Sequence, residues 1–129
     1  MMLTIQTLLP VAAGGALGAV LRVLAARPFT AMYGAAAWPW WLIFVNVSGS
    51  LLIGVLWALL QESRISQDWG PFLVTGVLGG YTTFSTFSLD TIRLMEDGRF
   101  GAAAFYVLAS VGLSLGAAYL GLQIGRALA

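Results

Sequence analysis

The sequence predicts an all-α membrane protein whose single domain, residues 1–129, contains four transmembrane helices. Hydrophobic residues make up 60% of the chain and charged residues only 9%, whereas a soluble domain carries about 25% charged residues. Four apolar segments approach the length of about 20 residues that a helix needs to cross the hydrocarbon core. Nearly all the charged residues lie between these segments, where the chain would meet water.

The four helices are expected at about residues 3–24, 38–61, 70–95 and 100–127. A charged or strongly polar residue ends each apolar run, as Arg22 does for the first. Tryptophans cluster at the start of the second helix, where aromatic side chains favour the headgroup level of a membrane. The connection 25–39 is the longest and is expected to be partly irregular.

The arginines bias the orientation of the chain only weakly. Hairpin connections place both termini on one side of the membrane, which leaves four arginines on one side and two on the other. Because a bias of basic residues normally sets orientation, this small difference predicts a chain that inserts in both directions. The first apolar run has no basic segment before it and no clear cleavage site, so we interpret it as a membrane helix and not as a signal peptide.

Composition excludes several kinds of site. The chain has no cysteine and no histidine, which removes disulfides, thiolate zinc sites and the commonest general base. The net charge of +1 indicates no polyanionic partner, so no nucleic acid is expected. No nucleophile–base pair is visible in the sequence, and we expect no enzymatic activity.

Glycines recur at four-residue spacing in several of the expected helices. Helices in lipid adhere by close packing, which small residues permit. We therefore interpret this spacing as a sign of tight packing or dimerisation and not of a specific function. The pairs are Gly14 and Gly18, Gly76 and Gly80, Gly112 and Gly116, and Gly121 and Gly125.

The second and third helices contain polar residues at membrane depth. Asn46 lies well inside the second helix, where a buried amide needs a hydrogen-bond partner. It either bonds to another helix or donates to an ion in a pore. The segment 79–88 reads GGYTTFSTFS. Paired glycines and β-branched threonines make a poor helix interior, so a break is predicted near 79–83. Irregular backbone occurs at membrane depth only inside protein or beside a polar cavity, where the freed carbonyl groups can bind a cation. The alternative interpretation of this segment is a kinked helix that packs on its neighbours.

Aromatic and hydroxyl side chains also share helix faces. Phe84 and Phe87 are three residues apart and face the same way; they either pack or offer their positive ring edges to an anion. Tyr106, Ser110 and Ser114 form one polar stripe, which either bonds back to its own helix or lines an ion path. No charged residue falls in the middle of a helix, although proton-coupled transporters normally need one. Neutral donors of this kind suit a small, strongly hydrated anion.

In these residues and motifs the chain resembles the Fluc/CrcB fluoride channels, and the matching pieces cover nearly its whole length. The most specific match is GGYTTFSTFS at 79–88, whereas the glycine pieces alone would be weak. The other matching pieces are GGALGA at 14–19 with Arg22, Val45-Asn46 followed by Gly49 and Gly54, and Asp90 soon after the third-helix motif.

This resemblance implies four-helix subunits that pair as an antiparallel, dual-topology homodimer in the inner (plasma) membrane, surrounded by lipid. Each dimer is expected to hold two pores through which fluoride leaves the cytoplasm passively. The residues that match the anion path are Asn46, Thr83, Phe84, Ser85, Thr86, Phe87, Tyr106, Ser110 and Ser114.

The resemblance also implies two features outside the pore itself. A structural sodium ion is expected at the dimer centre, held by backbone carbonyls of Gly79 and Thr82, and Arg22 resembles an arginine near the pore vestibule. One departure stands out, because the family often has Gly-Thr four or five residues before the asparagine. This chain has Trp41 and Leu42 there, so a hydroxyl of the pore wall or vestibule is lost.

Other functions remain as alternatives. A small dual-topology secondary transporter, of the fluoride/proton antiport or multidrug exporter type, fits the size of the chain. The exporters rely on an acidic residue in the first helix, and residues 3–21 contain none. A membrane subunit that only packs would not need the many hydroxyl groups of 79–88.

Overall fold

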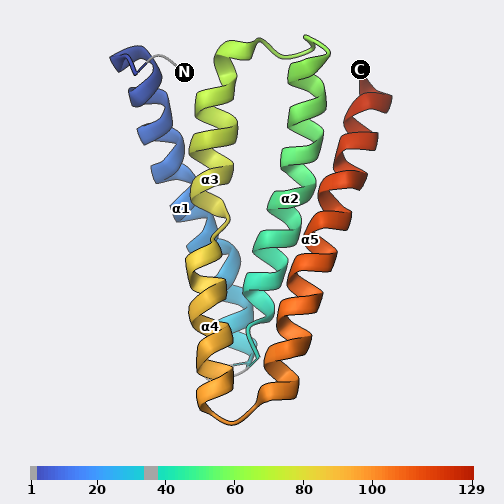
Figure 1. Cartoon of the computed structure of the whole chain (residues 1–129). Helices are drawn as coiled ribbons and strands as arrows, with labels where there is room; N and C mark the ends of the chain where they lie inside the picture. Colours follow the sequence, from blue (N-terminus) through green and yellow to red (C-terminus); the bar gives the residue numbers. More distant parts are fainter. Residues whose placement is uncertain (1–2, 34–37) are drawn as a thin grey trace.

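The computed structural model describes residues 3–33 and 38–129, and every regular element within these ranges is a helix. The helices run along one axis as an elongated bundle (Figure 1). α1 spans Ile5–Tyr33, α2 spans Trp40–Gln61 and α5 spans Phe100–Leu128. Each of these three helices is long and apolar enough to cross a membrane. The predicted all-α fold class is therefore confirmed.

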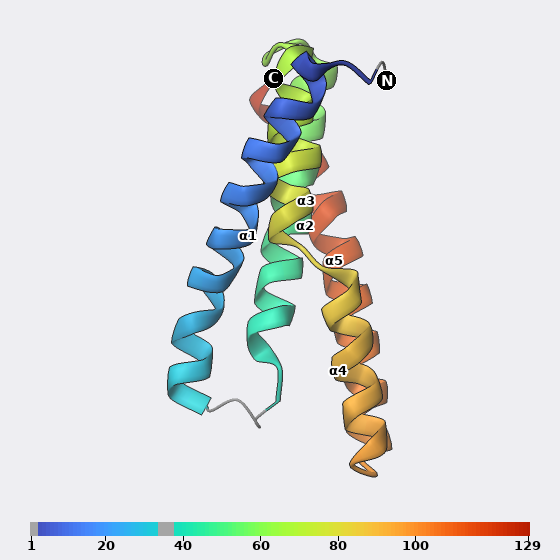
Figure 2. The ribbon, with the colours of Figure 1, turned by 90° about the vertical axis from the view of Figure 1, so that its left-hand side faces the viewer.

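Between α2 and α5 the chain forms a series of shorter helices. These are the 3₁₀ turn η1 at Gln67–Trp69, the π-helix η2 at Pro71–Leu78, α3 at Gly79–Tyr81 and α4 at Phe84–Glu96. α3 continues directly from η2, whereas two extended residues separate α3 from α4. Figure 2 shows that the chain crosses at this point from the side of α1 to the side of α5.

Two close helix pairs hold the bundle together. α1 packs on η2 and α3, and α2 packs on α5. A methyl group added at Gly18 would clash with the carbonyl oxygen of Val77, and one added at Gly121 would clash with that of Leu51. Such contacts of helix backbones require glycine, which confirms the packing role predicted for these residues. The pair Gly112 and Gly116 behaves differently, because no atom of another described helix lies within 4 Å of a methyl group added at either position.

α1 is longer than the sequence predicts. It continues past the expected end at residue 24, through Pro28, to Tyr33, so the first part of the connection 25–39 is helical and not irregular. Alanine, arginine and methionine favour helix in this stretch, and the Phe29 ring packs 5.5 Å from the ring of Phe44 on α2. Residues 34–37 of the predicted connection lie outside the described residues.

The surface of the bundle is apolar, as expected for a protein that faces lipid. Leu108 and Val23 are 73% and 67% exposed, which would be costly over so wide a surface in water. The start of α1 and the end of α5 lie at the same end of the bundle (Figure 1), which agrees with consecutive helices that run in alternating directions.

Candidate functional site

The break between α3 and α4 consists of Thr82 and Thr83, within the range 79–83 indicated by the sequence. Thr82 has φ −84° and ψ 157°, and Thr83 has φ −152° and ψ 124°, so both are extended. The backbone N–H and the hydroxyl of Thr82 both donate to the carbonyl of Leu78, at 3.0 and 2.9 Å. The Thr83 hydroxyl then caps α4 by accepting from the backbone N–H of Thr86 at 3.3 Å.

Asn46 on α2 holds the backbone of this break. Its Nδ2 donates to the carbonyl of Thr83 at 3.2 Å, and its Oδ1 accepts from the backbone N–H of Thr83 at 3.0 Å. Both backbone groups of Thr83 are thereby satisfied at a place where no helix serves them. One N–H of the amide is left over, and Asn46 lines the cavity described below. Asn46 therefore makes an interhelical bond and also faces a possible ion path.

The break leaves carbonyl groups without hydrogen bonds. Within residues 3–33 and 38–129, no donor bonds to the carbonyl oxygens of residues 79 to 82. Gly79 and Thr82, the predicted sodium ligands, are both in this group and both line the cavity. Neutral carbonyl oxygens are suitable ligands for a hard cation, so the residues present fit the expected ion.

A cavity of ≈ 390 Å³ lies beside the break and is bounded by α2, the broken segment and α5. Its polar lining comes from a few amide and hydroxyl groups, while most of its wall is apolar. Six of the predicted path residues line it, namely Asn46, Thr83, Phe84, Phe87, Ser110 and Ser114. The other three, Ser85, Thr86 and Tyr106, do not line this cavity.

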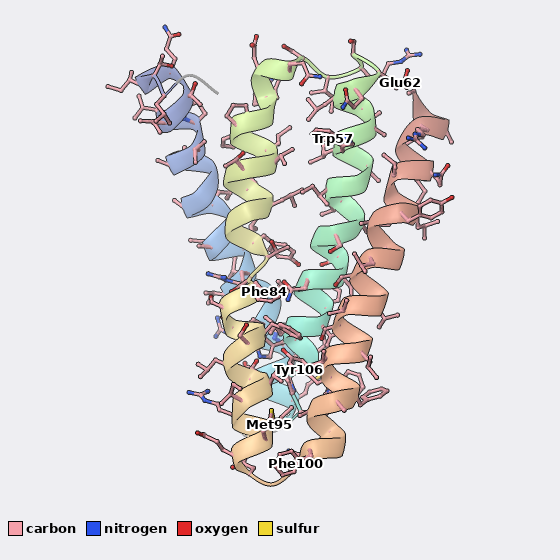
Figure 3. The ribbon with its side chains drawn as sticks, in the orientation of Figure 1. Trp57, Glu62, Phe84, Met95, Phe100 and Tyr106 are labelled. Atoms are coloured by element: carbon pink, nitrogen blue, oxygen red, sulfur yellow. The ribbon has the colours of Figure 1, made fainter. Side chains whose placement is uncertain are left out.

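Phe84 and Phe87 have different surroundings although they share a helix face. Their ring centroids are 5.4 Å apart. Phe84 is 77% exposed, whereas Phe87 is 9% exposed and packs with its ring 5.3 Å from that of Tyr106. Figure 3 shows Phe84 at the start of α4, and Tyr106 nearer the end of the bundle where α4 and α5 meet. Phe87 is thus a packed residue, while Phe84 stands open beside the cavity.

The hydroxyl stripe of α5 contains groups that have no protein partner. Tyr106 is 0% exposed and Ser110 is 5% exposed. The Ser110 hydroxyl makes no hydrogen bond to the described residues, and the Tyr106 hydroxyl faces the Asp90 carboxylate without forming a well-aligned hydrogen bond. Elsewhere in the bundle hydroxyls do bond back to their own helix, as the Thr91 hydroxyl does to the carbonyl of Phe87 at 2.8 Å. The back-bonded interpretation is therefore wrong for Ser110, which points an unused donor into the cavity lining.

The remaining predicted residues lie around this centre. Ser85 and Thr86 belong to the first turn of α4, where both hydroxyls lie within hydrogen-bond distance of the Thr83 hydroxyl, at 3.2 Å each. Arg22 lies in α1, partly exposed, and does not line the cavity. The vestibule role of Arg22 stays a prediction.

Sequence reasoning gave too little weight to two residues. Asp90 on α4 has one carboxylate oxygen buried without a partner among the described residues, and Trp38, before α2, has a buried indole N–H in the same condition. Asp90 stands three residues after Phe87, so the helical spacing already placed its side chain near the proposed path. For Trp38 the sequence offers no such signal, since tryptophans at a membrane boundary are common.

A bundle of apolar helices that encloses unpaired, neutral hydrogen-bond donors beside a broken helix defines a multi-pass membrane protein of the channel or transporter class. The comparison with protein families agrees with this class. The model for the CrcB-like protein, Camphor Resistance (CrcB) family matches residues 9–122. This chain belongs to the CrcB family.

Relatives with assigned names cover almost the whole chain. A protein of Nitrobacter winogradskyi named fluoride-specific ion channel FluC is 50% identical over 126 residues, which is 92% of this chain and 94% of the relative. A protein of Rhizobium meliloti with the same name is 49% identical over 122 residues, covering 94% of this chain and 97% of the relative. Fluoride-specific ion channel FluC 1 of Nitrobacter hamburgensis is 48% identical over 128 residues, covering 94% and 96%.

Proposed function

We propose that this chain is a fluoride channel of the plasma membrane, which lets fluoride leave the cytoplasm passively and so reduces fluoride toxicity. The observation that carries this proposal is the identity of 50% to a fluoride-specific ion channel over 92% of the chain. The function is conduction and not catalysis, because the relatives are named as channels. Fluoride is the transported substrate.

The chemistry of the cavity supports an anion as the cargo. A dehydrated fluoride ion needs hydrogen-bond donors in place of its water, and the hydroxyl of Ser110 and the free N–H of Asn46 are such donors. The open ring of Phe84 adds a positive edge. None of these groups carries a charge, so an anion is stabilised without being held too tightly to leave.

Asp90 is the one observation that favours the second candidate, a fluoride/proton antiporter. An intramembrane acid is the usual proton carrier in a coupled transporter, and one oxygen of Asp90 is buried. The relatives are nevertheless named as ion channels, which favours passive conduction. The two functions differ in whether a pH gradient alone drives fluoride uphill.

We propose further that the functional unit has four membrane-spanning segments per subunit and is an antiparallel, dual-topology homodimer. The weak arginine bias supports insertion in both directions. Phe84 is 77% exposed although it stands beside the cavity, so a second subunit is a suitable cover for this face. With two subunits there would be two equivalent pores, lined by the nine residues named above.

The sodium proposal rests on the carbonyls that the break releases. In an antiparallel pair, Gly79 and Thr82 of each subunit would supply oxygens to a cation on the two-fold axis. The described residues that line the cavity include no carboxylate, so a divalent charge would be poorly compensated and a monovalent ion fits better. When bound there, the ion would stabilise the dimer by mass action.

Fluoride efflux from liposomes that contain the purified protein tests the principal proposal. Fluoride should leave loaded vesicles when a potassium ionophore supplies the counter-ion path, while chloride remains inside. Equal fluxes of the two anions would refute fluoride selectivity. A pH gradient applied without an ionophore should produce no uphill fluoride movement, and sustained uphill movement would favour the antiporter.

A single cysteine tests the dual topology, because the chain has no cysteine of its own. Gln61→Cys is suitable, since Gln61 is an exposed, uncharged residue at the end of α2. In intact cells an impermeant maleimide should label about half of the protein, and permeabilisation should expose the rest. Labelling of all molecules, or of none, before permeabilisation would mean a single orientation.

A further inference from the structure

A row of aromatic rings leads from the break toward the start of α2. The ring centroids of Phe84 and Phe87 are 5.4 Å apart, those of Phe87 and Tyr106 are 5.3 Å apart, and those of Tyr106 and Trp38 are 5.7 Å apart. The last pair meets edge to face, with an interplanar angle of 88°. Trp38 therefore stands at the end of a continuous row that begins at the cavity.

The polar atoms at this end of the row have no protein partners. The indole Nε1 of Trp38 and the hydroxyl of Tyr106 are both buried and make no hydrogen bond to the part of the chain that the structure describes. A buried donor without an acceptor is costly, and native proteins rarely leave one unexplained. The Asp90 carboxylate lies near the Tyr106 hydroxyl, so the indole N–H of Trp38 is the donor to which the described residues offer no acceptor.

The described residues packed around this end of the row are mainly apolar. Leu42, four residues after Trp38, is 0% exposed and belongs to the same cluster as Phe87 and Tyr106. An indole N–H is a donor only and cannot accept a hydrogen bond. Trp38 therefore suits an anion, or the oxygen of a water molecule, and it does not suit a cation.

Two opposite charges lie close to this position on α4. Asp90 on α4 brings a carboxylate with one buried, unpartnered oxygen, but Arg93 follows it by three residues on the same helix and opposes its charge. The first turn of α2 contains no acidic residue and its N-cap, Pro39, makes no side-chain hydrogen bond. The positive N-terminal end of the α2 dipole is therefore uncompensated beside Trp38.

We propose that the indole N–H of Trp38 binds the permeating anion at the end of the aromatic row, beyond Tyr106, and so extends the path to the N-terminus of α2. This inference rests on the proposed fluoride function. Trp38 acts by direct contact with the ion, in the role that a hydroxyl or amide has elsewhere along the path. It is thus a further residue that determines affinity for fluoride.

The indole N–H resonances of the intact protein in detergent provide a test that does not depend on flux. The chain has five tryptophans, so uniform ¹⁵N labelling should yield five indole signals. Trp38→Phe assigns one of them, and if that variant does not fold, Trp→Phe changes at the other four positions assign it by elimination. We expect sodium fluoride, but not sodium chloride, to shift the Trp38 signal saturably. The signal of Trp57, which is 52% exposed on α2, is the matched control and should not move.

Trp38→Phe then measures the contribution of the donor, because the aromatic ring is kept. Fluoride affinity, taken from the titration of the remaining signals and from flux at low fluoride, should fall about tenfold, which corresponds to about 1.4 kcal/mol. Trp40→Phe changes an exposed ring whose centroid lies 6.0 Å from that of Trp38, and it should leave both the affinity and the flux unchanged.

The outcomes separate this inference from the proposed function. If wild-type protein conducts fluoride but its Trp38 signal does not respond to the ion, the donor role of Trp38 is refuted and the channel remains. A Trp38→Phe variant with full affinity refutes the inference in the same way. If the wild-type protein does not conduct fluoride at all, the proposed function fails, and the inference fails with it.

Discussion

Among the described residues, Asn46 is the only one whose side chain bonds the backbone of Thr82 or Thr83, and replacing it with leucine removes this link. Two hydrogen bonds are lost, the 3.2 Å bond from Nδ2 to the Thr83 carbonyl and the 3.0 Å bond from the Thr83 N–H to Oδ1. Each backbone group left unpaired costs about 1–3 kcal/mol. Because the pair is only partly buried, water can replace part of the loss, and we expect a fall of about 2–3 kcal/mol in the free energy of unfolding.

Unfolding of the purified protein in mixed detergent micelles measures this loss, and liposome efflux measures conduction. Asn46→Asp retains the acceptor for the Thr83 N–H but has no donor for the Thr83 carbonyl, so it should lose about half as much stability. Its added negative charge should also abolish fluoride flux. Thr91→Ala is the control, because the Thr91 hydroxyl is also partly buried but donates to the carbonyl of Phe87 on its own helix, at 2.8 Å.

The two roles of Asn46 predict different results for the leucine variant. If Asn46 holds the break, stability and flux fall together. If it serves only as an anion donor, flux falls while the free energy of unfolding stays at the wild-type value. An Asn46→Leu protein with unchanged stability would refute the reasoning from the hydrogen bonds to Thr83.

Three further predictions concern the aromatic pair, the glycine contacts and the cation. Phe84→Leu and Phe87→Leu should both reduce fluoride flux, but only Phe87→Leu should lower the free energy of unfolding, by about 1 kcal/mol, because Phe87 is 9% exposed and Phe84 is 77% exposed. Phe100→Leu is the control and should leave the flux unchanged. Unchanged flux in both of the other variants would leave the two rings only a packing role. Gly18→Ala should prevent α1 from packing on η2, because the methyl group meets the Val77 carbonyl. Gly101→Ala meets no atom of another described helix within 4 Å and should stabilise α5 by about 0.5–1 kcal/mol. Thermal unfolding measures both effects, and equal melting temperatures of the two variants would contradict them. Exchange of sodium for a large organic cation should lower the dimer fraction and the flux, and a dimer that is indifferent to the exchange would count against a structural sodium ion.

The amino-acid sequence by itself determined the class of protein and the place of its irregular backbone. A chain with 60% hydrophobic and 9% charged residues can satisfy its backbone in lipid only as helices. Within that constraint, the paired glycines and threonines of residues 79–83 made a local break the best prediction, since their low helix propensity acts over a few neighbouring residues. The motif at 79–88 also carried the resemblance to fluoride channels.

The tertiary structure decided which polar groups are paired and which are free. Asn46 meets Thr83 across 37 residues of chain, and this pairing depends on how α2 lies against the break. Ser110 and Thr91 are both hydroxyl residues in helices, yet only Thr91 bonds back to its own helix. The continuation of α1 through Pro28 likewise follows a contact with α2.

The physical reason is the range over which each effect acts. Hydropathy and helix propensity are properties of a short stretch of chain, so they can be evaluated from the sequence alone. The partner of a buried polar atom depends instead on the relative position of two helices, which is determined where glycines such as Gly18 and Gly121 allow backbones to touch. Only the packed bundle therefore shows that Ser110 and Trp38 have donors without an acceptor among the described residues.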